Sequence, residues 1–285
     1  KLNPLSQLLR MRVMYSHMSA ASYTLKPLPN FGAEVFGLQL RDSVPGPVVQ
    51  RIKDDVSRHR LLIFRDQGII SGPRQAEIGG WFGDLESTFR KHPRSPHPDV
   101  FRVSNDPAEG CIGVGREGWH IDGSFQPAPF SHSLYHIIDV PSRGATRFVA
   151  LTELLSSLPV DQLAHWRRLS MRSDRRDQAL KPLVYVHPGT GHPTMCFHTG
   201  MTAAYVEDAG SERERTLPAQ PLNREIEAAI EAQPVYDHCW RAGDFLIADN
   251  LALGHEASPD TQCPVSEVGL RVMHRSTVKG THAPT

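Results

Sequence analysis

Short apolar runs, most of them bounded by proline or glycine, set the strongest limit on how this 285-residue chain can fold. Their lengths and their content of β-branched and aromatic residues are typical of strands. In chain order they are LLIF (61–64), SLYHIID (133–139), TRFVAL (146–151), PLVYVH (182–187), TMCFH (194–198), PVYDHCW (234–240), DFLIAD (244–249) and GLRVMHRSTV (269–278). Many short strands with few helices predict a mainly β fold with flanking helices, built on a double-stranded β-helix, the jelly-roll type of sandwich or barrel.

Helical periodicity is confined to a few segments. Val48, Ile52 and Val56 recur at spacings of four, which predicts one apolar helical face. Helices are expected at 48–60, at 73–83, at about 151–169 and at 222–233. The polar and charged stretch EDAGSERERTLPAQP (207–221) is predicted to be a loop.

The first residues differ in composition from the rest. No acidic residue precedes Glu34, while lysine, arginine and several serines occur there. That composition resembles a mitochondrial transit segment, although a disordered leader, or an upstream extension of a protein that starts near Met18, would look the same. With neither a linker nor an internal repeat beyond it, we expect a leader over 1–24 and one domain over 25–285.

The overall composition excludes several classes of protein. The formal net charge is zero, which implies no nucleic-acid partner. No apolar run approaches the roughly 18 residues that a membrane span needs. The four cysteines show no CxxC spacing, which favours reduced thiols over a disulfide framework or a zinc site. The expected location is the cytoplasm, or the mitochondrion if the leader is a transit peptide.

The stretch GREGWHIDGSF (115–125) places His120 and Asp122 two residues apart. On a strand such residues point to the same side, and both can bind a metal ion. His255, which follows a strand ending in Asp249 and Asn250, could supply a third ligand. Two histidines and one carboxylate suit a non-haem Fe(II) site that activates O2. A zinc hydrolase, or an ordinary turn and an ordinary loop histidine, are the alternatives.

The C-terminal run contains two arginines on one predicted strand face. Arg271, Met273 and Arg275 alternate with Val272 and His274. If this face lines a barrel, two buried cations need anions, and the guanidinium fork suits carboxylate or sulfonate groups. The pair therefore predicts two small anionic ligands beside one metal. Salt bridges on an exposed edge are the alternative.

Taken together, these motifs resemble those of the taurine/2,4-dichlorophenoxyacetate dioxygenase family. WHIDGSF is similar to its WHTD-type metal motif, GATRFVAL to its GGDT segment, and WRAGDFLIADN followed by His255 to its distal-histidine segment. LRVMHR is similar to its final arginine strand, and GAEVFGLQL, RHRLLIFRDQ and WFGDL to earlier segments. The resemblance runs from about Leu25 to Gly280.

The resemblance implies an Fe(II)- and 2-oxoglutarate-dependent dioxygenase. Such an enzyme hydroxylates a small organic substrate with O2 and releases succinate and CO2. His120, Asp122 and His255 would hold the iron, and Trp119 would pack beside them. Thr146 and Arg271 would bind 2-oxoglutarate, and Arg275 stands where the taurine enzyme grips its sulfonate. The family also implies a homo-oligomer with no membrane partner.

Four departures concern the substrate. His92 is the only candidate for the family's substrate-side histidine, displaced by an apparent insertion. Arg116 replaces an asparagine of the taurine enzyme, and Arg143-Gly144-Ala145 stands for the GGD of its GGDT segment. The loop SPDTQCPVSEV (258–268) lengthens the gap between the last ligand and the arginine strand.

Arg116 and Arg275 together predict a larger or doubly charged anion rather than taurine. A hydroxylase of quaternary amines would need an aromatic cage, and a non-catalytic jelly-roll module would need no triad; these are the remaining alternatives. Because Asp122 supplies the carboxylate ligand, the resemblance does not extend to halogenases, in which a small residue stands there.

Overall fold

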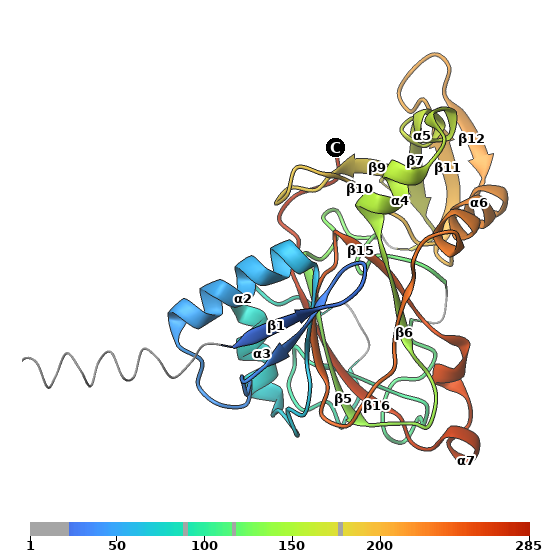
Figure 1. The fold of residues 1–285 in the computed structure, drawn as a ribbon. Coiled ribbons are helices and arrows are strands. Elements are labelled where there is room, and N and C mark those ends of the chain that lie inside the picture. Colours follow the sequence, from blue (N-terminus) through green and yellow to red (C-terminus); the bar gives the residue numbers. More distant parts are fainter. Residues whose placement is uncertain (1–22, 88–90, 116–117, 176–178) are drawn as a thin grey trace, which may run out of the picture.

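A computed structural model describes residues 23–87, 91–115, 118–175 and 179–285 (Figure 1). The strands are β1 Thr24–Pro27, β2 Ala33–Phe36, β3 Leu61–Phe64, β4 Phe101–Ser104, β5 His132–Asp139, β6 Thr146–Ala150, β7 Leu169–Ser173, β8 Lys181–Pro182, β9 Val184–Val186, β10 Pro193–Met195, β11 Thr202–Glu207, β12 Arg215–Pro218, β13 Tyr236–His238, β14 Phe245–Asp249, β15 Leu253–Ala257 and β16 Val272–Val278. The helices are α2 Gly46–His59, α3 Gly72–Gly80, α4 Leu151–Ser157, α5 Val160–Trp166, α6 Ala219–Glu231, α7 Val265–Val268 and the 3-10 helix η1 Pro259–Gln262.

Two facing sheets form the centre of the molecule. The larger sheet has the order β1-β2-β3-β14-β5-β16-β4, and a three-stranded sheet has the order β13-β6-β15. Their inner faces share one apolar cluster, in which Tyr135 of β5 meets Phe148 of β6 edge to face at 6.3 Å between ring centroids. Figure 1 shows β6 across from β5 and β16. This confirms the predicted mainly β fold with a jelly-roll core.

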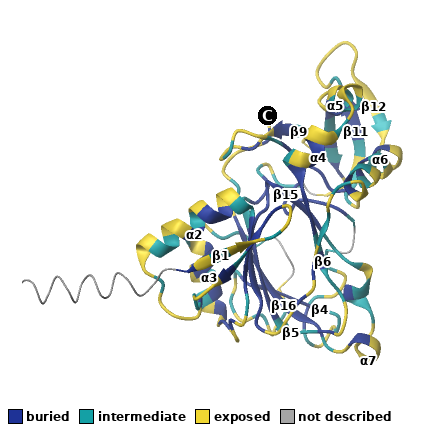
Figure 2. Cartoon of the chain, in the orientation of Figure 1, coloured by how far each residue is buried: buried dark blue, intermediate teal, exposed yellow. Residues whose placement is uncertain are grey.

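Two helices cover the outer face of the larger sheet. Ile52 and Val56 of α2 and Ile78 of α3 are buried in one cluster with Leu62 and Phe64 of β3. The far side of α2 is exposed, as the yellow residues of Figure 2 show. The four-residue apolar spacing therefore predicted this helix and its buried face correctly.

A smaller layer lies beyond the end of the three-stranded sheet (Figure 1). The strands β12-β11-β7-β8 form a four-stranded sheet, and β9 and β10 form a hairpin. Helix α6 packs its apolar face, Leu222, Ile226 and Ile230, into the same cluster as Trp166 at the end of α5. From this layer, Thr194 of β10 bonds to the Leu251 carbonyl, and His198, which follows β10, forms a bridge with His120.

Two sequence predictions here are wrong. The helix expected at about 151–169 is two helices, because Pro159 lies between them in an extended conformation and residues from Leu169 onward form β7. The loop expected at 207–221 contains β12, which pairs with β11, and the first residues of α6. Strand β12 lies at a sheet edge with mostly exposed residues, so no apolar alternation marked it.

Four further predictions concern the leader, the end of helix α3, the cysteines and membrane spans. The predicted leader lies outside the described residues except for Tyr23 and Thr24. Helix α3 ends at Gly80, three residues before the expected Gly83. None of the four cysteines is joined to another by a disulfide. Among the described helices, none has the length and apolar character to cross a lipid bilayer.

Candidate active site

His120 projects into the interior of the molecule from a segment that belongs to no regular strand. Its backbone exchanges two hydrogen bonds with His255 of β15, with N to O distances of 3.0 and 2.8 Å. The imidazole Nδ1 lies 2.7 Å from the Gly118 carbonyl, which accepts its proton and leaves Nε2 for a metal ion. Only His120 forms a bridge, and Asp122 already begins a turn. The i, i+2 spacing therefore predicted the right pair, although the segment forms a single bridge and not a strand.

The turn after Asp122 depends on glycine. Gly123 has φ +73°, and a Cβ at this position would lie 2.9 Å from the Phe130 ring. Only a residue without a side chain fits both the conformation and the space. The local sequence thus explains how the chain turns away directly after presenting the carboxylate.

The three predicted ligands converge. One ligand atom from each of His120, Asp122 and His255 lies within 4.8 Å of the others, and all three residues are buried. The Asp122 carboxylate oxygens lie 3.9 Å from His120 Nε2 and 3.6 Å from His255 Nε2. Two imidazoles and a carboxylate on one side of a site leave other positions open, as the 2-His-1-carboxylate type requires.

The protonation states suit a metal site. Burial opposes ionisation of Asp122, but the charges of Arg275, His255 and His120 hold its pKa well below the ordinary range. Burial lowers the pKa of His255 to about 3, with the charge of His120 adding to the effect. Near neutral pH the site therefore offers an anionic oxygen and a neutral imidazole nitrogen, the forms that bind divalent metals.

Asp122 is surrounded by donors. Ser133 Oγ donates to Oδ2 at 2.7 Å, and Arg275 Nη1 donates to Oδ1 at 2.8 Å. The Tyr135 hydroxyl lies 3.4 Å from Oδ2 and 3.2 Å from His255 Nε2. The carboxylate is thus oriented from two sides before any ligand arrives.

An inner cavity is lined by two residues of the triad, His120 and His255, and by Arg271. Thr146 and Arg275 also line it. Arg271 is 3% exposed, and burial lowers its pKa to about 10. Its Nη2 lies 3.6 Å from Met273 Sδ, its Nε has no hydrogen-bond partner, and none of the described acidic residues forms an ion pair with it. An anion that binds both here and at the metal would supply the missing charge.

A second cavity, of about 160 Å³, adjoins the triad on another side of His120. Its wall is mostly apolar, with Phe101, Val114, Ile121, Phe125 and Met201. Its polar groups, apart from the His120 and Asp122 ligands, are His198 and Arg275. This arrangement, an apolar wall with a few converging polar groups, is typical of a small-molecule site.

His198 is a site residue that the sequence did not indicate. Its ring stacks on His120 at 4.5 Å between centroids, and its Nδ1 accepts a hydrogen bond from Gly200 N at 3.2 Å. Burial and then the charge of His120 lower its pKa well below the usual value, so it is neutral and carries its proton on Nε2. One histidine among 15 has no spacing signal, which is why TMCFH predicted only a strand.

The other predicted site residues lie in different places. Thr146, Arg271 and Arg275 all line the inner cavity, so the arginine face does point inward. His92 does not line either cavity, and its Nε2 lies 3.2 Å from the Pro107 carbonyl. Arg116 lies outside the described residues. Trp119 is buried, and the Arg147 guanidinium carbon lies over it, 5.2 Å from the centroid of the Trp119 ring.

Comparison with known proteins gives consistent matches. The family model described as taurine catabolism dioxygenase TauD, TfdA family matches residues 24–277. The alpha-ketoglutarate-dependent 2,4-dichlorophenoxyacetate dioxygenase of Cupriavidus pinatubonensis is 28% identical over 84% of this chain and 92% of its own length. The (S)-phenoxypropionate/alpha-ketoglutarate-dioxygenase of Delftia acidovorans is 27% identical over 78% and 83%. The crystal structure of AAD-2 with Mn(II) and N-oxalylglycine has the same fold, with a TM-score of 0.73 at 22% identity over 93% of this chain and 100% of that one.

Proposed function

The chain belongs to the taurine catabolism dioxygenase TauD, TfdA family, and from this membership we propose that it oxidises a small organic anion with an apolar body. The reaction class follows from the family: the protein is a 2-oxoglutarate-dependent dioxygenase with a candidate His120, Asp122 and His255 metal triad. Fe(II) is the metal typical of this family. The zinc-hydrolase and non-catalytic alternatives therefore fall away.

The residues of the inner cavity fit 2-oxoglutarate, which is also called alpha-ketoglutarate. The buried guanidinium of Arg271 would pair with the distal carboxylate, and the Thr146 hydroxyl would donate to it. The metal triad at the other end would leave room for the keto acid, because three protein ligands leave positions open. Bound there, metal and co-substrate together supply the oxidising power, and the protein supplies position, charge and exclusion of water.

The apolar-walled cavity is where we place the substrate. His198 offers an Nε2 proton and Arg275 a guanidinium at the edge of this wall. Together they would hold a carboxylate or sulfonate, while Phe101 and Phe125 would contact an apolar or aromatic body. Two relatives are named for 2,4-dichlorophenoxyacetate and phenoxypropionate, each a carboxylate on an aromatic ether. That likeness supports an aryl-bearing carboxylate over taurine.

A quaternary amine fits this cavity less well. Phe101 and Phe125 could contribute to an aromatic cage, but the Arg275 guanidinium lies 5.6 Å from the Phe101 ring centroid and already occupies that face. A second cation would be repelled. The proposal therefore rests on the position of Arg275: its guanidinium lies between the apolar wall of the cavity and the metal ligands.

The proposal is tested with matched acids and their neutral methyl esters. Substrate-dependent succinate release and O2 consumption are measured for aryloxyalkanoates, alkyl and aryl sulfonates, and betaines. We expect an acid to be the best substrate. Arg275→Gln should raise the KM for that acid about tenfold or more, with less effect on its ester, because a charge-assisted hydrogen bond is lost. Arg143→Gln, an exposed arginine, is the control. A betaine or ester that outperforms every acid would refute the proposal.

A further inference from the structure

Asn250 grips the backbone of the carboxylate ligand. Its Oδ1 accepts a hydrogen bond from Asp122 N at 2.8 Å, and its Nδ2 donates to the Asp122 carbonyl at 2.9 Å and to the Phe130 carbonyl at 2.6 Å. Asn250 is 1% exposed. One side chain thus satisfies both backbone groups of Asp122, so the direction of that carboxylate depends on where Asn250 lies.

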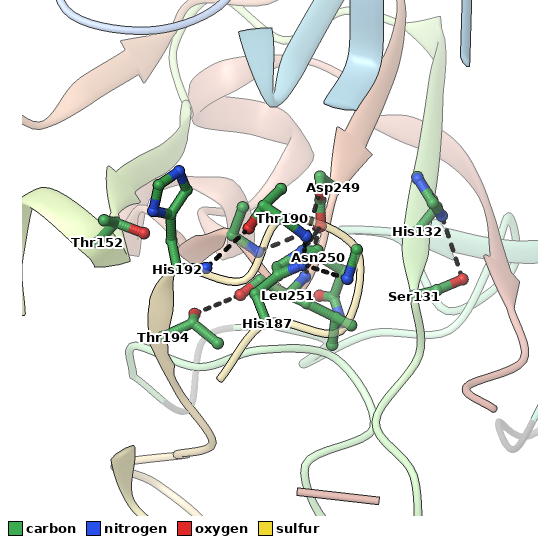
Figure 3. A network of polar contacts seen from close by, with 12 residues as sticks. Ser131, His132, Thr152, His187, Thr190, His192, Thr194, Asp249, Asn250 and Leu251 are labelled. Atoms are coloured by element: carbon green, nitrogen blue, oxygen red, sulfur yellow. Dashed lines mark hydrogen bonds and ion pairs between the residues drawn. The ribbon is translucent and has the colours of Figure 1, made fainter. Parts of the chain in front are cut away.

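The turn that carries Asn250 is itself held by hydrogen bonds of Asp249, the residue before it. Asp249 accepts hydrogen bonds from Leu251 N and Ala252 N at 3.1 and 3.2 Å, and His187 Nε2 lies 3.1 Å from both of its carboxylate oxygens. Figure 3 shows this network, with Thr194 of the β9–β10 hairpin bonded to the Leu251 carbonyl. The next strand, β15, begins at Leu253 and presents His255. One rigid turn therefore sets Asp122 and His255 relative to each other.

Asn105 holds the backbone N–H of Arg271, as Asn250 holds that of Asp122. Its Oδ1 accepts a hydrogen bond from Arg271 N at 2.8 Å, and its Nδ2 donates to the Cys263 and Gly269 carbonyls, each at 3.0 Å. Ser104 Oγ donates to the Arg271 carbonyl at 2.7 Å. Because Arg271 precedes the first residue of β16, these bonds hold the start of that strand and the long loop before it.

We propose that the two asparagines are positioning residues with separate tasks, Asn250 for the metal and Asn105 for the co-substrate. The assignment rests on the proposed function, since it takes Arg271 as the 2-oxoglutarate clamp. Neither asparagine lines the cavities. Each acts through the peptide group of a residue that does. For a metal ion, outer-shell support of this kind is commonly worth 10- to 100-fold in affinity, and we expect an effect of similar size on the co-substrate.

The test separates the two affinities in the folded protein. Mn(II) binding to the apo protein is measured by calorimetry, and 2-oxoglutarate binding is measured at saturating Mn(II). Asn250→Ala should weaken Mn(II) binding about tenfold or more, and leave 2-oxoglutarate binding within about threefold. Asn105→Ala should do the reverse. Each variant is the control for the other, and neither result depends on turnover.

Two further variants keep the proposal open to refutation. If Asn250→Ala does not fold, Asn250→Ser replaces it, because a serine hydroxyl cannot span both backbone groups of Asp122. Equal losses of both affinities in both variants, or no loss in either, would overturn the proposal. Arg271→Leu is the reference: if it leaves 2-oxoglutarate affinity unchanged, the proposed co-substrate clamp fails and the Asn105 assignment with it. Mn(II) binding by Asn250→Ala is measured without 2-oxoglutarate, so it tests the Asn250 assignment whether or not Arg271 is the co-substrate clamp.

Discussion

Asp122 and Arg271 are two buried charges on adjoining cavities of the site, and their surroundings differ completely. Asp122 has Ser133, Tyr135 and Arg275 around its carboxylate and two histidines within 4 Å. Arg271 has a methionine sulfur against its guanidinium and, among the described residues, no acidic partner. One charge is balanced by the protein, and the other is left to a ligand.

The difference shows which ligand each end of the site is suited to bind. Burying an ion without a partner destabilises a folded protein, so such a group persists where binding requires it. At the Asp122 end the protein fixes geometry in advance, as a metal site needs. At the Arg271 end it keeps a cation unneutralised, so that an incoming carboxylate gains a full ion pair.

The largest effect is expected from Asp122→Ala. The substitution removes the anionic ligand and leaves the Arg275 guanidinium buried without its carboxylate. Mn(II) affinity of the apo protein should fall at least about 100-fold, and 2-oxoglutarate turnover should be lost. Calorimetry and succinate release measure the two. Retention of full turnover would show that the metal lies elsewhere.

Much of this end was accessible from the sequence. His120, Asp122 and His255 were found because two ligands stand two apart and the third follows a strand that ends in Asp-Asn. The inward arginine face was predicted because Arg271 and Arg275 stand four residues apart in a run with strand-like composition. The contact between Asn250 and Asp122 joins residues 128 apart and gives no periodic signal. His198 likewise depends on a stacking contact that only the folded chain creates.

Arg271→Met should separate binding from stability. Loss of the ion pair should raise the KM for 2-oxoglutarate about 30-fold or more, since a desolvated charge-assisted pair contributes about 2–5 kcal/mol. The same substitution should raise the free energy of unfolding of the apo protein by about 1 kcal/mol or more, because it removes a buried cation without a partner. Steady-state kinetics and urea denaturation measure the two effects.

Arg275→Met is the matched control on the same strand face. It breaks the pair with Asp122, so the apo protein should lose about 3 kcal/mol of stability rather than gain any. Opposite stability changes in two methionine variants four residues apart would support the comparison. If both variants destabilise the protein equally, Arg271 has a partner in solution and the comparison is wrong.

The next prediction concerns His274, on the outer face of β16. His274 accepts a hydrogen bond from Arg102 at 2.8 Å, and burial, then the charge of Arg102, lowers its pKa to about 3. Between pH 3 and about 6.5 the unfolded chain binds a proton that the folded one does not, so stability is lost as pH falls through this window. His274→Gln should reduce the loss between pH 7.5 and pH 5 by about 2 kcal/mol.

Urea denaturation at the two pH values measures this change. His192→Gln, at an exposed position, is the control for replacing a histidine by glutamine, and it should change the pH dependence much less than His274→Gln does. Other buried histidines contribute to the total acid sensitivity, so only the share of His274 should disappear. An unchanged pH dependence in His274→Gln would mean that this ring is protonated in the folded protein.

The smallest effect is expected from Trp240→Phe, at the anion end of the cavity. Trp240 Nε1 donates to Thr146 Oγ1 at 3.2 Å, so the hydroxyl proton of Thr146 is left to point elsewhere. A carboxylate on Arg271 is the acceptor that would receive it.

Phenylalanine keeps the apolar contact and removes the donor, which frees the hydroxyl to rotate. A neutral hydrogen bond contributes about 1 kcal/mol, so the KM for 2-oxoglutarate should rise about fivefold, with kcat and Mn(II) affinity nearly unchanged. Thr146→Val, which deletes the hydroxyl itself, should raise that KM at least as much. If Trp240→Phe instead raises the KM for the primary substrate, Thr146 serves the other cavity, and Arg271 has no neighbour of its own for the carboxylate.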